Sequence, residues 1–401
     1  MRKIPFLTLL VVILFSCSKN ESVLKPTITS VDPVSGGAGT QLTITGANFS
    51  ITASSNTVTI NNVVATIQSA NSTSITVVVP DMAGTGTVNV TSNGTTAIGP
   101  IFSYSDVLIA GYETNSNSKG VAKYWKNGID ASLTNGTHDA RAYSITAVNK
   151  DIYVAGYENN NSNEIGVAKY WKNGTAFDMT NGTQISNASS ICVVGSDIYV
   201  AGQEGLTAKY WKNGIATPLT DGTRLAAATS IAISGSDVYV SGYESNANAI
   251  RVAKYWKNGV AISLTDGTQN AMANTIIVVG SDAYVTGYES PNGIRIAKFW
   301  KNGVGIFLTS GTSFISNSNF IAINGNDIYV AGYDNSNATY WRNGTETLLN
   351  NGTNVYGIYV SNNDIYFAGI DGIQTVYWKN EKDFPLTDEM NYAKTYSIFV
   401  R

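Results

Sequence analysis

Seven carboxylates recur at one position in successive, similar segments of the chain and could form a ring: Glu113, Glu158, Glu204, Glu244, Glu289, Asp334 and Asp371. Such a ring is a candidate cation site, because hard cations prefer carboxylate ligands. The first five acids, however, are each followed in the next expected strand by a lysine: Lys123, Lys169, Lys209, Lys254 and Lys298. Thr339 and Val376 take that place after the two aspartates. Since acid and lysine change together, we interpret the five as structural Glu–Lys contacts and expect no metal.

Other catalytic chemistry has few possible members. His138 is the only histidine, so a His-rich metal site is excluded and a His-based triad has one candidate residue. Of the two cysteines, Cys192 lies in an apolar run and is expected to be a buried, inert thiol. A two-carboxylate hydrolase stays open, although the acids are repeated rather than a unique pair. We expect a protein without catalytic residues or cofactors.

The element that positions these residues is a repeat marked by seven tryptophans. They lie 37 to 46 residues apart, in a phrase best preserved as Ala-Lys-Tyr-Trp-Lys-Asn-Gly: Trp125, Trp171, Trp211, Trp256, Trp300, Trp341 and Trp378. A period of this length indicates an array of similar units that bury their apolar faces against each other. Because the tryptophan recurs in every unit, we expect it to fill the wedge between neighbouring units rather than to stack on a sugar.

Each unit contains four short strand patterns. Asn-Gly turns join the third strand to the fourth, as expected for type I′ hairpins. The central strands are apolar without clean alternation, so both sheet faces should be covered. This all-β pattern predicts a seven-bladed β-propeller over residues 105–401. The array opens on a second strand at residues 106–111 and closes on a first strand at 397–400, so the last strand should complete the first blade.

Residues 25–104 hold no tryptophan and form a separate strand-rich module. Alternating runs separated by Gly, Asn and Pro predict a small antiparallel sandwich. The stretch resembles the IPT/TIG family of immunoglobulin-like domains at Pro26, Ile28, Pro33, Gly36, Gly39, Thr40, Leu42, Ile44, Gly46, Asn48, Phe49, Pro80, Val88, Val90, Phe102 and Tyr104, among others. The resemblance implies an Ig-like fold and a spacer or interaction role, without catalysis.

The N-terminus has the pattern of a secretory signal. Two basic residues precede a twelve-residue apolar stretch at 4–15, which is too short to span a bilayer. The following Leu-Phe-Ser-Cys resembles a bacterial lipobox, which implies a signal peptide over 1–16, acylation of Cys17 and a lipid-anchored tether over 17–24. An ordinary signal peptide with an incidental cysteine is the alternative. The resemblance predicts a bacterial outer-membrane lipoprotein, exposed at the cell surface.

Charge and loop variation narrow the possible partners. Charged residues make up 13% of the chain with a net charge of −3 and no basic patch, which argues against nucleic acid as a partner. On the propeller face where the first strands begin, the loops vary in length and content, as binding loops do. The candidate contacts with a ligand there are His138, Arg141, Arg224, Tyr356 and Tyr392.

Three functions remain open from the sequence. The first is a surface-tethered protein whose propeller binds a polysaccharide or a protein. The second is a structural component of an envelope complex without a soluble ligand. The third is a polysaccharide-active enzyme. The first agrees best with a rigid repeat whose loops vary.

Overall fold

A computed structural model describes residues 24–160, 164–309, 315–350, 352–361, 364–388 and 390–401. The signal peptide, Cys17 and nearly all of the tether lie outside these residues. The chain divides into two compact units that meet between Tyr104 and Ser105. Among the described residues, no helix is long and apolar enough to cross a membrane.

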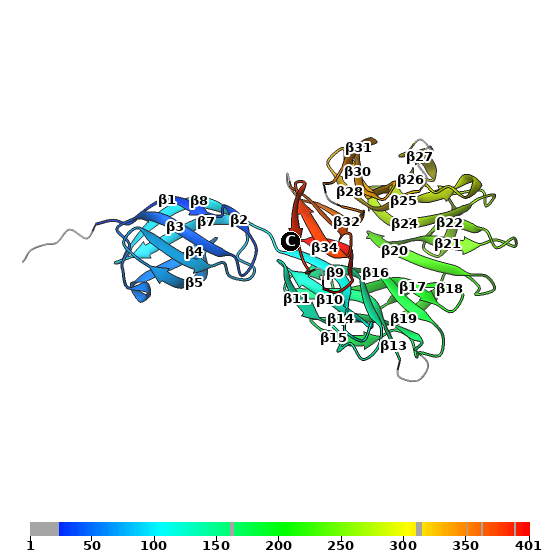
Figure 1. Ribbon diagram of the computed structural model, residues 1–401, viewed down its shortest axis with the longest axis horizontal. Helices are drawn as coiled ribbons and strands as arrows, with labels where there is room; N and C mark the ends of the chain where they lie inside the picture. The colour runs from blue at the N-terminus through cyan, green and yellow to red at the C-terminus, as the bar shows by residue number, and fades with distance from the viewer. Residues whose placement is uncertain (1–23, 161–163, 310–314, 351, 362–363, 389) are drawn as a thin grey trace, which may run out of the picture. The chain divides into compact units, whose positions relative to one another are not determined.

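The N-terminal unit is an all-β sandwich, drawn in blue to cyan in Figure 1. Its strands pair in the order β1-β3-β6-β5-β4-β7-β8-β2. Alternate side chains of these strands point inward, so Leu42, Ile44, Val58 and Phe102 are fully buried. The elements are β1 (Thr27–Asp32), β2 (Ser35–Gly36), β3 (Gln41–Ala47), η1 (Ala53–Ser55), β4 (Asn56–Ile60), β5 (Val63–Ala70), β6 (Ser74–Val78), β7 (Gly86–Ser92) and β8 (Thr95–Tyr104).

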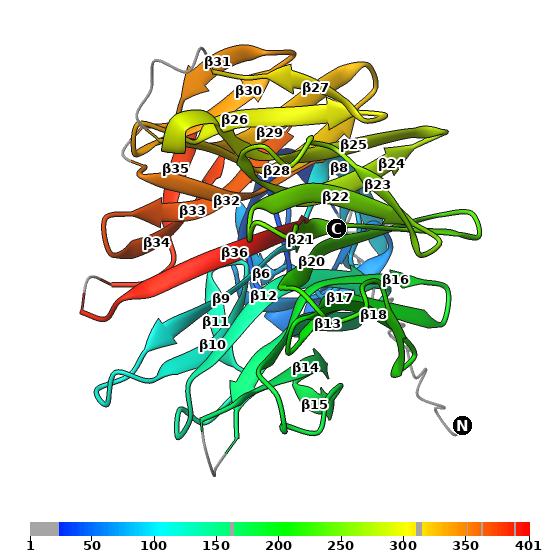
Figure 2. The same ribbon diagram turned by 90° about the vertical axis from the view of Figure 1, so that its right-hand side faces the viewer.

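The C-terminal unit is a ring of four-stranded antiparallel sheets, and seven such blades are formed by the described residues (Figure 2). Blade 1 holds β9 (Val107–Thr114), β10 (Gly120–Lys126), β11 (Ile129–Ser132) and β36 (Ala393–Val400). Blade 2 holds β12 (Ala140–Val148), β13 (Asp151–Asn159), β14 (Gly166–Lys172) and β15 (Thr175–Asp178). Blade 3 holds β16 (Ser186–Val194), β17 (Asp197–Glu204), β18 (Thr207–Lys212) and β19 (Ile215–Pro218).

The remaining blades repeat this arrangement. Blade 4 holds β20 (Ala226–Ser234), β21 (Asp237–Ser245), β22 (Arg251–Lys257) and β23 (Val260–Ser263). Blade 5 holds β24 (Asn270–Val279), β25 (Asp282–Ser290), η2 (Pro291–Gly293), β26 (Ile296–Lys301) and β27 (Val304–Phe307). Blade 6 holds β28 (Ser316–Asn324), β29 (Asp327–Asp334), β30 (Asn337–Arg342) and β31 (Thr345–Leu348). Blade 7 holds β32 (Asn354–Ser361), β33 (Asp364–Asp371), β34 (Gln374–Lys379) and β35 (Lys382–Pro385).

The last strand closes the ring, as the two ends of the repeat predict. β36, red in Figure 2, pairs antiparallel with β9 and becomes the innermost strand of blade 1. Beyond it, Asp106 and Arg401 exchange backbone N–H···O bonds of 2.8 and 3.1 Å. The carboxylate of Asp106 is fully buried and lies 3.2 Å from Lys126 Nζ and 3.4 Å from an Arg401 guanidinium nitrogen. The first and last residues of the ring therefore share a buried ion pair.

The tryptophans fill the wedges between blades. All seven indole side chains are at most 1% exposed. Trp171 of blade 2, for example, packs with Leu108, Ala110 and Ala122 of blade 1, and the other six pack on the preceding blade in the same way. The alanines of the repeat thus leave room for the neighbouring indole.

The Trp-Lys-Asn-Gly phrase forms the turn between the third and fourth strands of a blade. Its side chains also bind this turn to the start of the second strand. In blade 2, Asn173 Nδ2 donates to Asp151 Oδ1 over 2.7 Å, and Asn173 Oδ1 accepts from the backbone N–H of Ile152. Lys172 pairs with the same Asp151 over 2.7 Å. The other six blades repeat the Asn–Asp bond at 2.7 or 2.8 Å. The repeated phrase therefore encodes a turn and its fastening.

A glycine in each second strand lies opposite a β-bulge in the first strand. In blade 4 the register shifts between Ala228 and Ser230, opposite Gly242. A Cβ at Gly242 would overlap the carbonyl oxygen of Ala227. In the other blades a Cβ at the equivalent glycine would overlap the equivalent carbonyl oxygen: Gly111, Gly156, Gly202, Gly287, Gly332 and Gly369. The glycine of each second strand is therefore needed for the bulge.

We predict that Gly242→Ala destabilises the propeller by roughly 2–4 kcal/mol, because the strand must move away from the bulge. The control is Gly259→Ala in the same blade, where a Cβ meets nothing within 4 Å but φ is +82°. That variant should lose only about 1 kcal/mol from left-handed strain. Denaturant unfolding of both variants measures the difference, and equal losses would contradict the role of the bulge.

Candidate functional site

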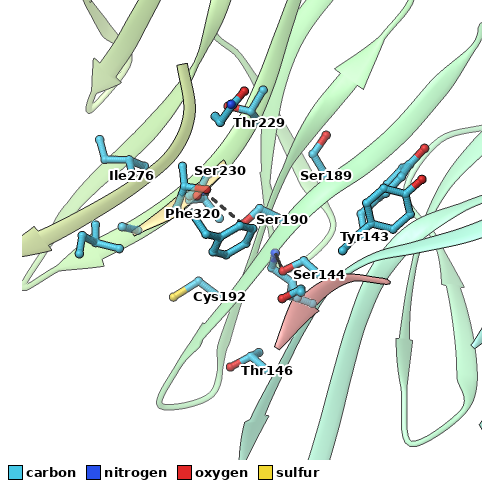
Figure 3. A pocket seen from close by; sticks show the side chains of 18 of the residues that line it. Tyr143, Ser144, Thr146, Ser189, Ser190, Cys192, Thr229, Ser230, Ile276 and Phe320 are labelled. Carbon is cyan, nitrogen blue, oxygen red and sulfur yellow. Dashed lines mark hydrogen bonds between the residues drawn. The ribbon is translucent and has the colours of Figure 1, made fainter. Parts of the chain in front are cut away.

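The central channel of the propeller is a cavity of about 640 Å³ lined by the innermost strands (Figure 3). Each of these strands carries one bulge, and the inserted residue lines the channel near the end where the strand begins. Around the ring from blade 1, the inserted residues are Tyr396, Tyr143, Ser189, Thr229, Asn274, Asn319 and Tyr356. The repeat therefore presents seven variable side chains at one end of a fixed channel.

Three of these inserted residues are tyrosines from adjacent blades, and together they form the tyrosine arc: Tyr356, Tyr396 and Tyr143. The ring centroids of Tyr143 and Tyr396 are 4.9 Å apart in an edge-to-face contact, and those of Tyr356 and Tyr396 are 5.9 Å apart. The three side chains are partly exposed. Burial raises the pKa of Tyr143 to about 12 and also raises the pKa values of Tyr356 and Tyr396, so all three hydroxyls stay protonated at neutral pH.

One cation lies against the tyrosine arc, and a second lies against Tyr112, whose ring centroid is 6.1 Å from that of Tyr396 in the arc. Lys394 Nζ is 4.1 Å from the centroid of the Tyr356 ring and 4.8 Å from that of Tyr396. Arg141 stacks on Tyr112, with its Cζ 4.7 Å from the ring centroid. Both contacts have cation–π geometry. We call these two cations and the tyrosine arc the channel mouth.

Counter-charge at the channel mouth is sparse. The nearest carboxylate, Asp139, accepts the hydroxyl of Tyr157 over 2.6 Å and the backbone N–H of Gly120 over 3.0 Å. Arg141 Nε lies 3.8 Å from Asp139 and is buried without a hydrogen-bond acceptor. Within the described residues, Lys394 Nζ makes no ion pair and no hydrogen bond. Two positive charges thus face one carboxylate that already has other donors.

The burial of Lys394 without a carboxylate partner among the described residues lowers its pKa. Burial, with a smaller contribution from the positive charge of Arg141, lowers the pKa of Lys394 to about 8. Arg141 keeps its charge, because neighbouring tyrosines outweigh its burial and raise its pKa. At neutral pH both groups are cationic. The charge on the buried Lys394 lowers the free energy of unfolding.

The opposite side of the ring carries a chain of amide side chains. Asn274 Nδ2 donates to Asn317 Oδ1 over 2.9 Å, and Asn317 donates to Asn319 over 2.8 Å. Asn319 donates to Asn354 over 3.0 Å, and Asn354 reaches the hydroxyl of Tyr356 over 3.1 Å. This amide arc (Asn274, Asn317, Asn319 and Asn354) fixes the orientation of each amide and joins the tyrosine arc at Tyr356.

The five sequence-predicted contact residues separate into two groups. Arg141 and Tyr356 belong to the channel mouth, and the ring of Tyr392 lies 6.2 Å from that of Tyr112 at its edge. His138 instead lines a separate pocket of about 290 Å³ with Glu158 and Lys169. Arg224 is exposed in the connection between β19 and β20 and makes none of the contacts of the mouth.

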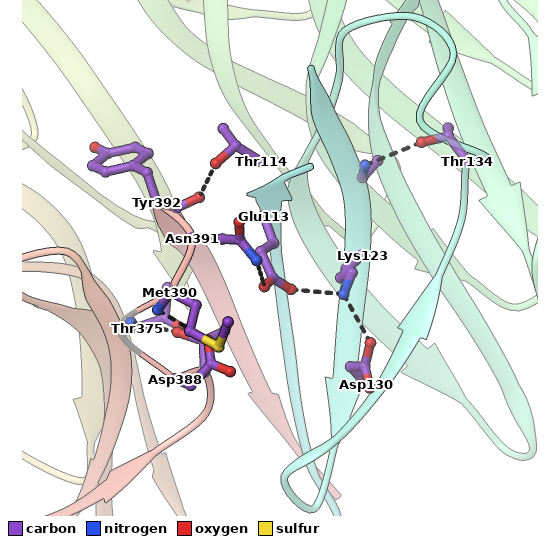
Figure 4. Close-up of polar contacts among 12 residues, drawn as sticks. Glu113, Thr114, Lys123, Asp130, Thr134, Thr375, Asp388, Met390, Asn391 and Tyr392 are labelled. Carbon is purple, nitrogen blue, oxygen red and sulfur yellow. Dashed lines mark hydrogen bonds and ion pairs between the residues drawn. The ribbon is translucent and has the colours of Figure 1, made fainter. Parts of the chain in front are cut away.

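The five predicted Glu–Lys contacts form ion pairs. Lys123 lies 2.7 Å from Glu113 and also 2.9 Å from Asp130, and Asn391 donates to the same glutamate (Figure 4). The other pairs are Lys169–Glu158 at 3.2 Å, Lys209–Glu204 at 2.5 Å, Lys254–Glu244 at 2.6 Å and Lys298–Glu289 at 2.8 Å. Each glutamate is therefore neutralised within its own blade. No cluster of three or more metal-ligating side chains occurs among the residues that the structure describes.

Sequence reasoning missed Lys394, Tyr396 and Tyr143 as parts of one site. They lie in first strands, which the repeat suggested were structural, and only the bulges turn Tyr143 and Tyr396 to the channel beside Lys394. Cys192 needs a correction, since the thiol was expected to be buried and the side chain is partly exposed on the channel wall (Figure 3). Burial nevertheless raises its pKa, which keeps the thiol protonated and unreactive.

Comparison with known proteins identifies the family of the N-terminal module. Residues 26–105 match the model of the IPT/TIG domain. This module is an IPT/TIG domain. No curated protein matches the chain in sequence.

Several solved structures have a similar course of the chain at low identity. A Bacteroides thetaiotaomicron protein of unknown function is 12% identical with a TM-score of 0.41, covering 94% of this chain and 99% of that one. An auxiliary nutrient binding protein from Bacteroides ovatus is 14% identical with a TM-score of 0.42, covering 81% and 86%. A puromycin-hydrolyzing peptidase from Mycobacterium tuberculosis is 9% identical with a TM-score of 0.47, covering 70% and 53%.

Replacing the desolvated lysine should stabilise the protein. The pKa of Lys394 falls from 10.5 to about 8 on folding, so the unfolded chain binds more protons between these pH values and stability rises with pH across that window. We predict that Lys394→Met is more stable than the wild type by about 1–3 kcal/mol at pH 7. The advantage should shrink as the pH rises above 8. Denaturant midpoints at pH 7 and 9.5 measure it, and a less stable variant at pH 7 would refute a desolvated lysine.

Proposed function

We propose that this protein is a non-catalytic binding protein whose propeller takes a saccharide chain at the channel mouth. The observation that carries the proposal is that the inserted residues place three tyrosines on one part of the ring and two amides, Asn274 and Asn319, on another, around a cavity of about 640 Å³. A concave site with apolar walls and a few fixed polar groups is the usual form of a ligand site.

The two arcs correspond to the two kinds of surface on a sugar. The C–H faces of a pyranose ring pack on aromatic rings, and its hydroxyls need oriented donors and acceptors. Tyr143, Tyr356 and Tyr396 offer partly exposed rings with protonated hydroxyls. Asn274 and Asn319 offer amides that their neighbours already hold in place. Little conformational entropy would be lost on binding, because the blades hold both arcs.

The carboxylates near the channel mouth support a binding role over hydrolysis. Glycosidases use a pair of carboxyl groups across the scissile bond, one as acid and one as base or nucleophile. Among the described residues, Asp139 is engaged by Tyr157 and Gly120, and Glu113 is engaged by Lys123 and Asn391. Because each carboxylate is already held by two partners, neither is free to act as the acid or as the base of a glycosidase.

The proposed location rests on the N-terminal sequence. The apolar segment followed by Cys17 supports a lipid anchor in the bacterial outer membrane, with the chain at the cell surface. The IPT/TIG domain would then act as a spacer between the anchor and the propeller. A lipid anchor needs no transmembrane helix and leaves the propeller free to meet a polysaccharide.

The proposal predicts that Tyr356→Ala weakens polysaccharide binding about tenfold or more, since it removes one stacking surface of the tyrosine arc. The control is Phe177→Ala. It removes an exposed ring of β15, the outermost strand of blade 2, which stacks on Tyr170 of β14. Affinity electrophoresis of both variants against a panel of neutral and acidic polysaccharides measures the effect.

Three results would contradict the proposal. Equal loss of retention in both variants would place binding on the outer surface. Retention that survives Tyr356→Ala would place the ligand elsewhere. Release of shortened oligosaccharides by the wild-type protein would show an enzyme instead.

A further inference from the structure

The channel mouth holds an excess of positive charge that the fold does not use. The Lys394 ammonium lies on two aromatic rings and forms no ion pair with a described residue, whereas the lysines of the five Glu–Lys pairs each lie within 3.2 Å of a carboxylate. Arg141 Nε is buried without an acceptor, 3.8 Å from Asp139. Buried charges in proteins are normally paired, but Lys394 has no carboxylate partner among the described residues, and Arg141 has a distant one in Asp139.

Both cations occupy the same position of the repeat, in the adjacent blades 1 and 2. Each precedes the bulge and pairs with the residue after the strand's glycine. The equivalent residues in blades 3 to 7 are uncharged: Asn187, Ala227, Met272, Asn317 and Asn354. At this position of the repeat, positive charge therefore occurs only in the two blades that also carry Tyr143 and Tyr396, and a packing requirement of the repeat does not explain it.

We propose that the ligand is an acidic saccharide, and that its carboxylate or sulfate group binds between Lys394 and Arg141 while its ring packs on the tyrosine arc. The inference rests on the proposed function and adds the chemical class of the ligand. An anion here would accept hydrogen bonds from Lys394 Nζ and from the partly exposed guanidinium of Arg141, and such charge-assisted bonds are about twice as strong as neutral ones. It would also supply the counter-charge that Lys394 lacks among the described residues.

The groups around Lys394 make its charge the one that changes in the working pH range. Arg141 and Tyr143 face it from β12, Tyr356 from β32, Tyr112 from β9 and Tyr396 from its own strand. Each of these groups has a raised pKa and keeps its charge state from pH 7 to 9. Lys394, with a pKa of about 8, loses its proton over this range. Affinity for an anion should therefore fall by up to about tenfold between pH 7 and 9.

The test compares acidic polysaccharides with their neutral counterparts on the full protein. The probes are polygalacturonate and alginate with their carboxyl-reduced forms, and dextran sulfate with dextran. We expect at least one acidic polymer to bind ten or more times tighter than its neutral partner, and the carboxylated and sulfated arms identify the anion. Lys394→Met should abolish this preference, and Lys394→Arg should retain it while removing the fall between pH 7 and 9.

A matched control separates a specific site from general attraction. Lys119→Met removes one positive charge from a loop of blade 1, where Lys119 pairs with Glu164, and should leave the preference unchanged. Because Lys394→Met is expected to be at least as stable as the wild type, loss of binding in that variant cannot be ascribed to unfolding.

The outcomes distinguish this inference from the function on which it rests. If neutral polymers bind as tightly as acidic ones and Tyr356→Ala abolishes that binding, the saccharide site stands and the anion inference is wrong. Equal loss in Lys119→Met and Lys394→Met also overturns the inference. If no polymer of the panel is retained, both the proposed function and the inference fail.

Discussion

The close approach of a glycine to a bulged strand is the constraint on which this propeller depends. In every blade the first strand inserts one residue, and the carbonyl before the bulge occupies the space that a Cβ of the second strand would need. The glycine keeps the two strands paired while the inserted side chain lines the channel. Because the position recurs in each blade, the fold supplies a ring of side chains whose backbone is fixed but whose identity is free. The tyrosine arc is built entirely on this ring, and the amide arc is built on it at Asn274 and Asn319.

The rest of the repeat keeps that ring rigid. The indoles fill the wedges between blades, and the Asn–Asp bond with its neighbouring lysine, or arginine in blade 6, fastens each outer hairpin to the second strand. The Glu–Lys pairs neutralise the carboxylates that end the second strands. The buried contact of Asp106 with Arg401 joins the two ends of the ring. With these contacts repeated blade by blade, differences between blades concentrate at the inserted residues and in the loops, and the charged pair of blades 1 and 2 is the largest such difference at the mouth.

The fold was largely predictable because the signals for it are local and repeated. The tryptophan period gave the blades, the unmatched first and last strands gave the closure, and the joint change of acid and lysine indicated the ion pairs. The site was only partly predictable, because it depends on the direction in which each side chain points and not only on the place of the residue in the repeat. Arg141 and Tyr356 could be chosen from the break in the repeat, but His138 and Arg224 share the same loops and point elsewhere. Lys394 and Tyr396 lie in the closing strand, whose role in joining the ring concealed its second role in lining the channel. A single-residue bulge reverses the alternation of a strand, and no spacing pattern in one sequence reports it.

The central claim is that the excess positive charge of the channel mouth receives an acidic group of a saccharide. A crystal structure of the full protein with an acidic oligosaccharide tests it most directly. The account predicts a carboxylate or sulfate oxygen about 3 Å from both Lys394 Nζ and a terminal guanidinium nitrogen of Arg141, with a sugar ring against Tyr356. An oligosaccharide bound on the IPT/TIG domain or on the outer strands, with the channel mouth empty, would contradict it.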